Sequence, residues 1–292
     1  MTVRAAPVRR NHPSPAERVR RRLAAVAGSS LAREMPSGYH RFGRVLVVQR
    51  PDSLAPYDAV LGEAWREELD VETVLVKSGP VEGELRTPRL RCIAGERTET
   101  EVVEYGVRWR FDAARVMFAI GNRAERRRLG ALVAPGERVA DLFAGIGYFT
   151  IPVALPGRAS SVWAVEKNPV SVRYLRENIA LNGVEDRVTV VPGDNRTVEL
   201  PRGSFDRVVL GYLPSAVPWV PRAVELLSPH GGWVHVHLVG DVRVPVSNAA
   251  ALVEARAASV GARALEPFAV RVVKPYGPGR NHLVVDARLR PS

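Results

Sequence analysis

The sequence is poor in cysteine and lysine and has no long apolar run. Cys92 is the single cysteine among 292 residues. This excludes an internal disulfide and a cysteine metal cluster, and it fits a reducing, cytoplasmic compartment. No apolar run approaches the roughly 20 residues that a membrane-spanning helix requires. The basic N-terminus has no apolar segment behind it, unlike a secretory signal.

Positive charge is concentrated at the N-terminus. The first 34 residues hold eight arginines against two glutamates, a net charge of +6 out of +11 for the whole chain. Such a segment indicates either a polyanionic partner such as nucleic acid or a solubilising tail. It contains no aromatic residue that could stack on a base, which weakens the nucleic-acid interpretation. We expect residues 1–37 to form a flexible basic arm, within which residues 15–26 could form a helix.

One glycine-containing segment organises the rest of the chain. Residues 139–143 are typical of a short buried strand, and a small-residue turn follows with Ala144, Gly145 and Gly147. Glycine suits a turn whose backbone takes unusual dihedral angles and lies close to a ligand. A helix is expected to begin near Tyr148, with its free N–H groups facing that ligand.

Polar residues end the next two expected strands. Glu166 ends the strand 162–165 and lies 25 positions after Asp141, the spacing at which a carboxylate typically binds ribose hydroxyls. Asp194 and Asn195 follow the strand 188–191. The combination resembles the S-adenosylmethionine (SAM) site of a class I methyltransferase-type fold, in which such a pair meets the adenine. The alternative is an ordinary tight turn in another doubly wound domain.

The pattern after Arg138 alternates strands and helices, which predicts an α/β fold with a doubly wound sheet and helices on both faces. Residues 270–274 and 282–288 are expected as a final antiparallel pair. Residues 38–112, which include an expected strand over 42–48, are typical of a small α+β domain. We therefore divide the chain into an arm (1–37), a small α+β domain (38–112) and a Rossmann-like catalytic domain (113–292).

The chain also resembles a specific family, the wybutosine-synthesis enzymes that transfer a 3-amino-3-carboxypropyl group from SAM and are related to the tRNA guanine-37 methyltransferases. The resemblance runs from about residue 38 to the end. It is carried by Gly83–Pro88, Glu104–Gly106, Gly121–Asn122, Asp141–Pro152, Glu166–Pro169, Glu177–Ile179, Asp194–Arg196, Gly211–Tyr212 and Tyr276–Gly279.

This resemblance implies a reaction and a set of contacts. The γ-carbon of the methionine part of SAM would face the nucleophile, and 5′-methylthioadenosine would be released. Glu166 would hold the ribose, and Asp194 and Asn195 the adenine. Arg126 would pair with the cofactor carboxylate or else lie on a solvated helix face. The cofactor-binding set is Arg126, Asp141, Phe143, Ala144, Gly145, Gly147, Glu166, Asp194 and Asn195. Ala119 replaces the serine that is usual in the family.

Three residues are candidates for chemistry at the acceptor. Tyr212 follows the fourth strand in Leu210–Ser215, which lacks the Asn/Asp-Pro-Pro-Tyr/Phe signature of amino methyltransferases. It could form the acceptor wall or a plain strand-to-helix turn. His235 and His237 alternate on one strand and share a face. They could supply a general base or be buried sheet histidines. With no third ligand near them in sequence, no metal site is expected.

The acceptor is expected to be a small molecule, because the wybutosine pathway is chiefly archaeal and eukaryotic whereas this composition looks bacterial. Three lysines accompany 39 arginines, with abundant Ala, Val, Gly and Pro, as in GC-rich bacterial genomes. A concrete candidate from secondary metabolism is an activity like that of isonocardicin synthase, which alkylates a phenol oxygen of a β-lactam antibiotic.

The first alternative is the same transfer to a wybutosine-precursor guanosine in tRNA, in which the basic arm, Arg86, Arg89 and Arg91 would track phosphates. The second is a SAM-dependent methyltransferase, and a non-catalytic binding module is more remote.

Overall fold

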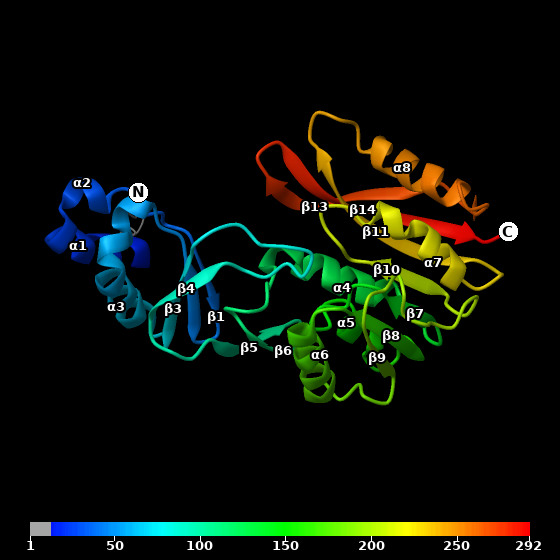
Figure 1. Cartoon of the computed structure of the whole chain (residues 1–292), viewed down its shortest axis with the longest axis horizontal. Helices are drawn as coiled ribbons and strands as arrows, with labels where there is room; N and C mark the ends of the chain where they lie inside the picture. The colour runs from blue at the N-terminus through cyan, green and yellow to red at the C-terminus, as the bar shows by residue number, and fades with distance from the viewer. Residues whose placement is uncertain (1–12) are drawn as a thin grey trace, which may run out of the picture. The chain divides into compact units, whose positions relative to one another are not determined.

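The structure, a computed structural model, describes residues 13–292. The chain divides into two compact units (Figure 1). The N-terminal unit comprises Met1–Val102 and Asp112–Met117, and the C-terminal unit comprises Val103–Phe111 and Phe118–Ser292. No helix within residues 13–292 combines the length and the apolar character needed to cross a membrane.

The N-terminal unit is built on a four-stranded sheet in the order β1-β2-β3-β4. The parallel pair β2 and β3 is connected through the 3-10 helix η1 and the helix α3. The expected single strand over residues 42–48 is instead a hairpin of β1 and β2, because the chain turns at Gly43 with φ +54°. The bounds are β1 (Tyr39–Phe42), β2 (Val45–Val48), η1 (Asp52–Tyr57), α3 (Asp58–Leu69), β3 (Thr73–Lys77) and β4 (Leu90–Ala94).

The described part of the expected N-terminal arm is folded. Helix α1 (Pro15–Ala27) begins with a capping box in which Ser14 and Glu17 satisfy each other's backbone N–H groups. Val19 and Leu23 are fully buried in the same core as α3. The short helix α2 (Ser29–Ala32) follows. The expectation of a flexible arm is therefore wrong for residues 15–32, because α1 has an apolar face that the core covers; residues 1–12 lie outside the described residues.

The C-terminal unit contains an eight-stranded sheet in the order β12-β14-β11-β10-β7-β8-β9, with β13 paired to β14. Strands β11, β10, β7, β8 and β9 are parallel, as the predicted doubly wound sheet requires. The strands are β7 (Arg138–Asp141), β8 (Ser161–Glu166), β9 (Val188–Pro192), β10 (Arg207–Leu210), β11 (Gly232–Asp241), β12 (Arg263–Ala264), β13 (Ala269–Gly277) and β14 (Arg280–Arg290). The predicted antiparallel final pair is confirmed as β13 and β14.

Two groups of helices pack on this sheet. Helices α5 and α6 contact β8 and β9, whereas α7 and α8 contact β10, β11 and β14. The helical segments are η2 (Ile120–Asn122), α4 (Arg123–Leu132), α5 (Thr150–Ala154), α6 (Pro169–Leu181), η3 (Val217–Trp219), α7 (Val220–Leu226) and α8 (Ser247–Ala258). A separate two-stranded sheet is formed by β5 (Glu99–Glu104) and β6 (Val107–Asp112).

The strand order reverses beside β7, since β8 and β9 lie on one side of it and β10 and β11 on the other. In open α/β sheets, ligands bind at the carboxyl ends of the strands at such a reversal point. The glycine-containing turn leaves β7 at this point.

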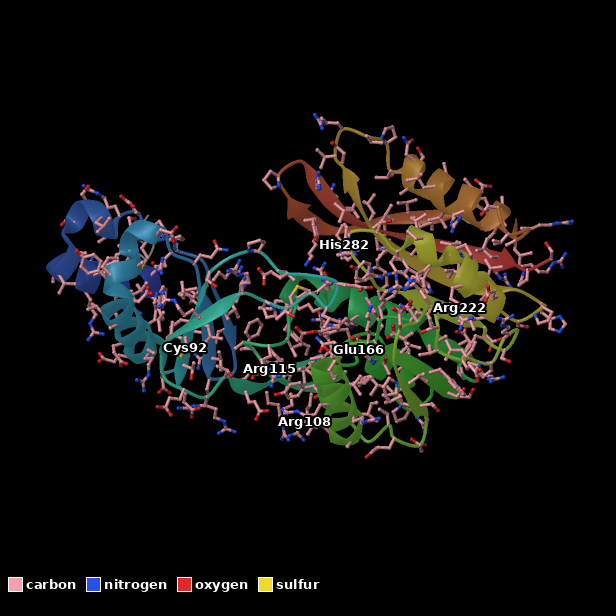
Figure 2. The ribbon with its side chains drawn as sticks, in the orientation of Figure 1. Cys92, Arg108, Arg115, Glu166, Arg222 and His282 are labelled. Carbon is pink, nitrogen blue, oxygen red and sulfur yellow. The ribbon has the colours of Figure 1, made fainter. Side chains whose placement is uncertain are left out.

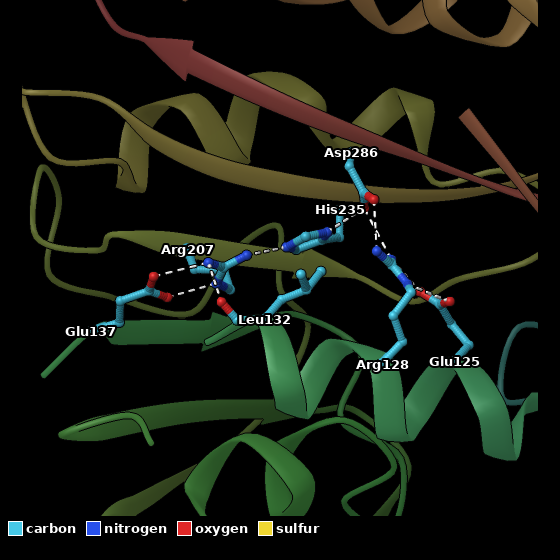
Figure 3. A network of polar contacts seen from close by, with 7 residues as sticks. All are labelled: Glu125, Arg128, Leu132, Glu137, Arg207, His235 and Asp286. Atoms are coloured by element: carbon cyan, nitrogen blue, oxygen red, sulfur yellow. Dashed lines mark hydrogen bonds and ion pairs between the residues drawn. The ribbon is translucent and has the colours of Figure 1, made fainter. Parts of the chain in front are cut away.

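A buried polar network ties α4 to three strands of the sheet (Figure 3). Arg207 on β10 forms an ion pair with Glu137 (2.6 Å) and contacts His235 Nε2 (2.6 Å). His235 Nδ1 contacts Asp286 (2.6 Å), which also pairs with Arg128 (2.8 Å). Arg128 pairs in turn with Glu125 (2.6 Å). Burial without such partners would be costly for every one of these groups.

Candidate cofactor and acceptor site

The glycine turn after β7 requires glycine at two positions. Gly145 has φ +58° and Gly147 has φ +105°. A Cβ on Gly145 would lie 2.6 Å from the Tyr148 ring, and one on Gly147 would lie 2.7 Å from Ile151. The turn closes through a hydrogen bond from the Gly147 N–H to the Ala144 carbonyl (2.8 Å). The predicted turn is therefore present, and the helix expected near Tyr148 begins at Thr150.

Asp141 supports this turn from inside the protein. Its carboxylate is fully buried and accepts hydrogen bonds from the Thr150 hydroxyl (2.8 Å) and the Phe143 N–H (3.3 Å). Burial raises the pKa of Asp141 to about 6. Asp141 thus connects the two ends of the turn, and we propose that it acts on a ligand indirectly, through the position of the turn.

Glu166 is the carboxylate that faces the turn. It ends β8 in the C-terminal unit, where Figure 2 labels it. Its side chain accepts hydrogen bonds from the N–H groups of Gly145 (2.7 Å) and Asn168 (2.7 Å). Burial raises the pKa of Glu166. A carboxylate has about four lone-pair positions, so it can hold two backbone donors and still accept from hydroxyl groups. This donor set fits the ribose of a nucleoside, which supports the predicted role.

Asp194 and Asn195 differ in their surroundings. Asn195 is buried and donates from its amide to the Leu142 carbonyl (2.7 Å), so it is fixed against the strand end that precedes the turn. The Asp194 carboxylate pairs with Lys167 (3.1 Å) and Arg196 (2.5 Å), which hold its pKa well below the usual range. The structure therefore places Asn195 against β7, while Asp194 is a charged group between two basic side chains.

An aromatic group lies where the turn meets the segment after β10. The rings of Phe143 and Tyr212 are stacked at 5.1 Å between centroids, and Trp219 packs against both at 5.2 and 5.4 Å. All three rings are half-buried. Stacked aromatic side chains are a usual surface for an unstacked nucleobase. Tyr212, expected as part of an acceptor wall, is thus brought next to the turn, while Trp219 was not anticipated.

Arg126 is committed to other partners. Its guanidinium pairs with Glu104 and donates to the Ala119 carbonyl (3.1 Å). It also lies over the rings of Trp109, Phe118 and Tyr148, at 5.9, 4.9 and 5.8 Å from their centroids. The side chain is only 4% exposed. The expected ion pair with a cofactor carboxylate is not supported by this geometry, and we propose that Arg126 positions Tyr148 and the Ala119 carbonyl.

His235 and His237 are both buried, at 1% exposure. His235 has both ring nitrogens occupied by Arg207 and Asp286, so a proton could be taken up only by breaking the network. His237 Nδ1 contacts His282 Nε2 at 2.8 Å, and the other nitrogen of each ring, His237 Nε2 and His282 Nδ1, has no partner among the described residues. The general-base hypothesis receives no support from this placement, which matches the other alternative, buried sheet histidines. Within residues 13–292, no group of three or more candidate ligands is placed to hold a metal ion.

These buried histidines should lower the stability of the folded protein as the pH falls. Burial lowers the pKa of His235, lowers that of His237 well below its usual value, and lowers that of His282 to about 4. The unfolded chain therefore takes up protons first as the pH falls through about 6.5. Stability contributed by the neutral rings is present above that pH and is lost below it. We expect His282 alone to remove about 2 kcal/mol of unfolding free energy between pH 7 and 5.

Urea unfolding at pH 7 and pH 5 tests this prediction. Asp141 contributes to the pH dependence of stability with the opposite sign, because its raised pKa adds stability as the pH falls through about 6. The quantity to compare is therefore the loss of unfolding free energy between pH 7 and pH 5. This loss should be smaller in His282→Asn than in wild type. The same difference should be unchanged in His230→Asn, since His230 is exposed. An equal difference in all three proteins would contradict the prediction.

Asn178 lies in one of the segments that carry the family resemblance, but it was not predicted as a site residue. It is fully buried on α6, and its amide donates to the carbonyls of Ile146 (3.1 Å) and Arg110 (3.0 Å). Its own carbonyl accepts from the Arg110 N–H (2.6 Å). Asn178 thus ties the glycine turn to β6. An amide on the apolar face of an amphipathic helix was the available signal.

The fold and this site define a class. A glycine turn at the reversal point of a doubly wound sheet, with a carboxylate ending the next strand, is the arrangement of class I SAM-dependent methyltransferase-type proteins. Two known domain families match the chain. The family described as TRM5/TYW2 methyltransferase domain matches residues 100–265, and the family described as TYW2 N-terminal domain matches residues 19–98. The chain belongs to the TRM5/TYW2 methyltransferase-domain family.

Individual relatives agree. The chain is 33% identical over 273 residues to the tRNA(Phe) (4-demethylwyosine(37)-C(7)) aminocarboxypropyltransferase of Pyrococcus horikoshii, covering 93% of this chain and 96% of that protein. The crystal structure of P. horikoshii TYW2 in complex with MeSAdo superimposes with a TM-score of 0.81 at 30% identity, covering 95% of this chain and 100% of the other. Trm5b from Pyrococcus abyssi gives a TM-score of 0.76 at 32% identity, covering 89% and 77%.

These relatives correct one expectation. We expected a small-molecule acceptor, on the pattern of isonocardicin synthase. The P. horikoshii relative, matched over nearly its whole length, is named for transfer to a nucleoside of tRNA(Phe). The preference for a small molecule was therefore wrong, because it rested on composition and inferred source and on no residue of the site. Antibiotic biosynthesis is dropped with it.

Proposed function

We propose that this protein is a SAM-dependent 3-amino-3-carboxypropyl transferase that acts on a wybutosine precursor at position 37 of tRNA(Phe). The observation that carries the proposal is the near full-length similarity to an enzyme of that name, together with a turn and carboxylate that fit a nucleoside. A tRNA substrate also agrees with the cytoplasmic compartment expected from the single cysteine.

Different residues of the site would bind different parts of SAM and of the acceptor. SAM, when bound, supplies an electrophilic γ-carbon on a sulfonium leaving group. Glu166 would hold the ribose, the Gly145 and Gly147 turn would let the backbone approach the nucleoside, and Asn195 would border the adenine. Phe143 and Tyr212 would stack on the acceptor base. Alignment of the reacting atoms can supply roughly 7–11 kcal/mol of the barrier reduction.

The reaction balances without a metal or a redox partner. A carbon–carbon bond forms between the γ-carbon and C7 of the base, and the sulfonium–γ-carbon bond breaks with its electron pair going to sulfur. The proton on C7 then passes to water, and 5′-methylthioadenosine is released. Methyl transfer is the second candidate, because the matched family also contains the methyltransferase Trm5 and the fold is shared.

The acceptor is tested with tRNA(Phe) carrying 4-demethylwyosine. After incubation with the protein and SAM, nuclease digestion and mass spectrometry should show the aminocarboxypropyl adduct on that nucleoside. Unmodified tRNA(Phe), with guanosine at position 37, is the matched control and should stay unchanged. A methyl adduct on guanosine 37, or no adduct on either RNA, would contradict the proposed acceptor.

A further inference from the structure

A small cavity in the C-terminal unit is lined by four arginines. Its volume is about 120 Å³, and its walls come from the β5–β6 hairpin, α4 and the end of α5. The side chains that matter to its chemistry are Glu104, Tyr105, Arg123, Arg126, Arg127 and Arg158. No role proposed above uses Arg123, Arg127 or Arg158.

The cavity has more positive than negative charge. Arg126 is neutralised by Glu104. Within residues 13–292, no carboxylate is paired with Arg123 or Arg127. Arg158 donates to the Gly130 carbonyl, which does not change its charge. Three like charges held at one cavity repel one another, so an anion bound there would be stabilised.

Two of the three arginines of the N-terminal unit that were expected to track phosphates are already paired with carboxylates. Arg89 pairs with Glu82 (2.9 Å), and Arg91 pairs with Asp58. An arginine already paired with a carboxylate gains less from a phosphate, because the existing partner must first be displaced. Arg123 and Arg127 carry no such penalty.

One wall of the cavity positions the Arg127 guanidinium. The Arg127 guanidinium lies 4.8 Å from the centroid of the Tyr105 ring, and Tyr105 is 54% exposed. A guanidinium stacked on a ring keeps its N–H edges available for hydrogen bonds. The apolar wall includes Val107, Trp109 and Pro152. Arg123 and Arg127 are themselves exposed, so a phosphate on a macromolecule can reach them.

We propose that this cavity binds one backbone phosphodiester of the RNA substrate, through Arg123, Arg127 and Arg158. This inference rests on the proposed function for its partner. Arginine forks match phosphate oxygens in geometry and charge, and the cavity volume suits a single phosphate group. The contact would hold the RNA without touching the reacting base.

The test is tRNA binding at several salt concentrations, measured by fluorescence anisotropy, with wild type, Arg123→Gln/Arg127→Gln and the control Arg256→Gln. Arg256 is exposed on α8, away from the lining residues. The double variant should bind tRNA at least about tenfold more weakly. Its slope of log affinity against log salt should be smaller by about 1. Arg256→Gln should match wild type, and SAM affinity should be equal in all three.

The outcomes separate the two proposals. If wild type binds tRNA and the double variant binds it with the same affinity and slope, the phosphate site is overturned and the proposed function stands. If wild type fails to bind tRNA while still binding SAM, the proposed acceptor is wrong, and the proposed RNA phosphate site is overturned with it. A calorimetric titration with inorganic phosphate tests whether the cavity binds the free anion. If free phosphate binds through Arg123 and Arg127 while tRNA affinity is unaffected by their loss, the site serves a small anion and the RNA proposal is overturned.

Discussion

Replacing Glu166 by Gln should raise the dissociation constant for SAM by about 100-fold, which corresponds to about 3 kcal/mol. The carboxylate holds the Gly145 and Asn168 N–H groups and is proposed to accept from the ribose. Hydrogen bonds to a charged acceptor contribute about 1.5–3 kcal/mol each. The amide of Gln removes the charge and places an N–H₂ group against backbone donors. Isothermal calorimetry with SAM measures the effect.

The matched control is Glu185→Gln, which removes one carboxylate from an exposed position before β9. It should leave SAM affinity within twofold of wild type, because no ligand contact is proposed there. Circular dichroism should show that both variants keep the wild-type fold. Unchanged SAM affinity in folded Glu166→Gln would remove the ribose role from this residue.

Replacing Asp286 by Ala should lower the unfolding free energy by about 3–5 kcal/mol. Asp286 is 9% exposed and neutralises Arg128 while accepting from His235 (Figure 3). Its partners hold the pKa of Asp286 well below the usual range. Its contribution is therefore present above about pH 4 and is lost only as the pH falls below that value. Truncation would leave Arg128 short of one partner inside the protein. Urea unfolding at pH 7 measures the loss.

Asp241→Ala provides the comparison, because Asp241 pairs with Arg243 at 2.5 Å where the arginine side chain is 84% exposed. An exposed pair of this kind should change stability by less than about 1 kcal/mol. Asp286→Asn keeps the shape and should recover part of the loss. Equal effects of Asp286→Ala and Asp241→Ala would show that the buried network does not stabilise the sheet as described.

The gathering of three candidate cofactor residues around the glycine turn could be predicted because parallel strands end at one edge of a sheet. Asp141, Glu166 and Asn195 are far apart in sequence but each follows an apolar strand, so their meeting required only the strand order. The two glycines were recognisable because only glycine tolerates those backbone angles at close approach. Local signals and one topological rule were sufficient here.

Partners chosen by tertiary packing could not be predicted. The pairing of Arg126 with Glu104 depends on how the β5–β6 hairpin packs on α4, and that of His237 with His282 depends on the register of β11 and β14. Helix α1 is a different case. A helix over residues 15–26 is predictable because its capping box, Ser14 with Glu17, is a local signal. The burial of Val19 and Leu23 in the core that contains α3 depends on tertiary packing, which the basic composition of the segment does not indicate. The acceptor had no diagnostic motif, so only relatives could indicate it.

Analysis of the by-product is the most direct test of the central claim, that the site presents the γ-carbon of SAM to the RNA base. The protein should be incubated with SAM and tRNA(Phe) carrying 4-demethylwyosine, and the released nucleoside identified by chromatography and mass spectrometry. We predict 5′-methylthioadenosine in an amount equal to the modified RNA. Release of S-adenosylhomocysteine in its place would show that the methyl group is transferred and would contradict the account.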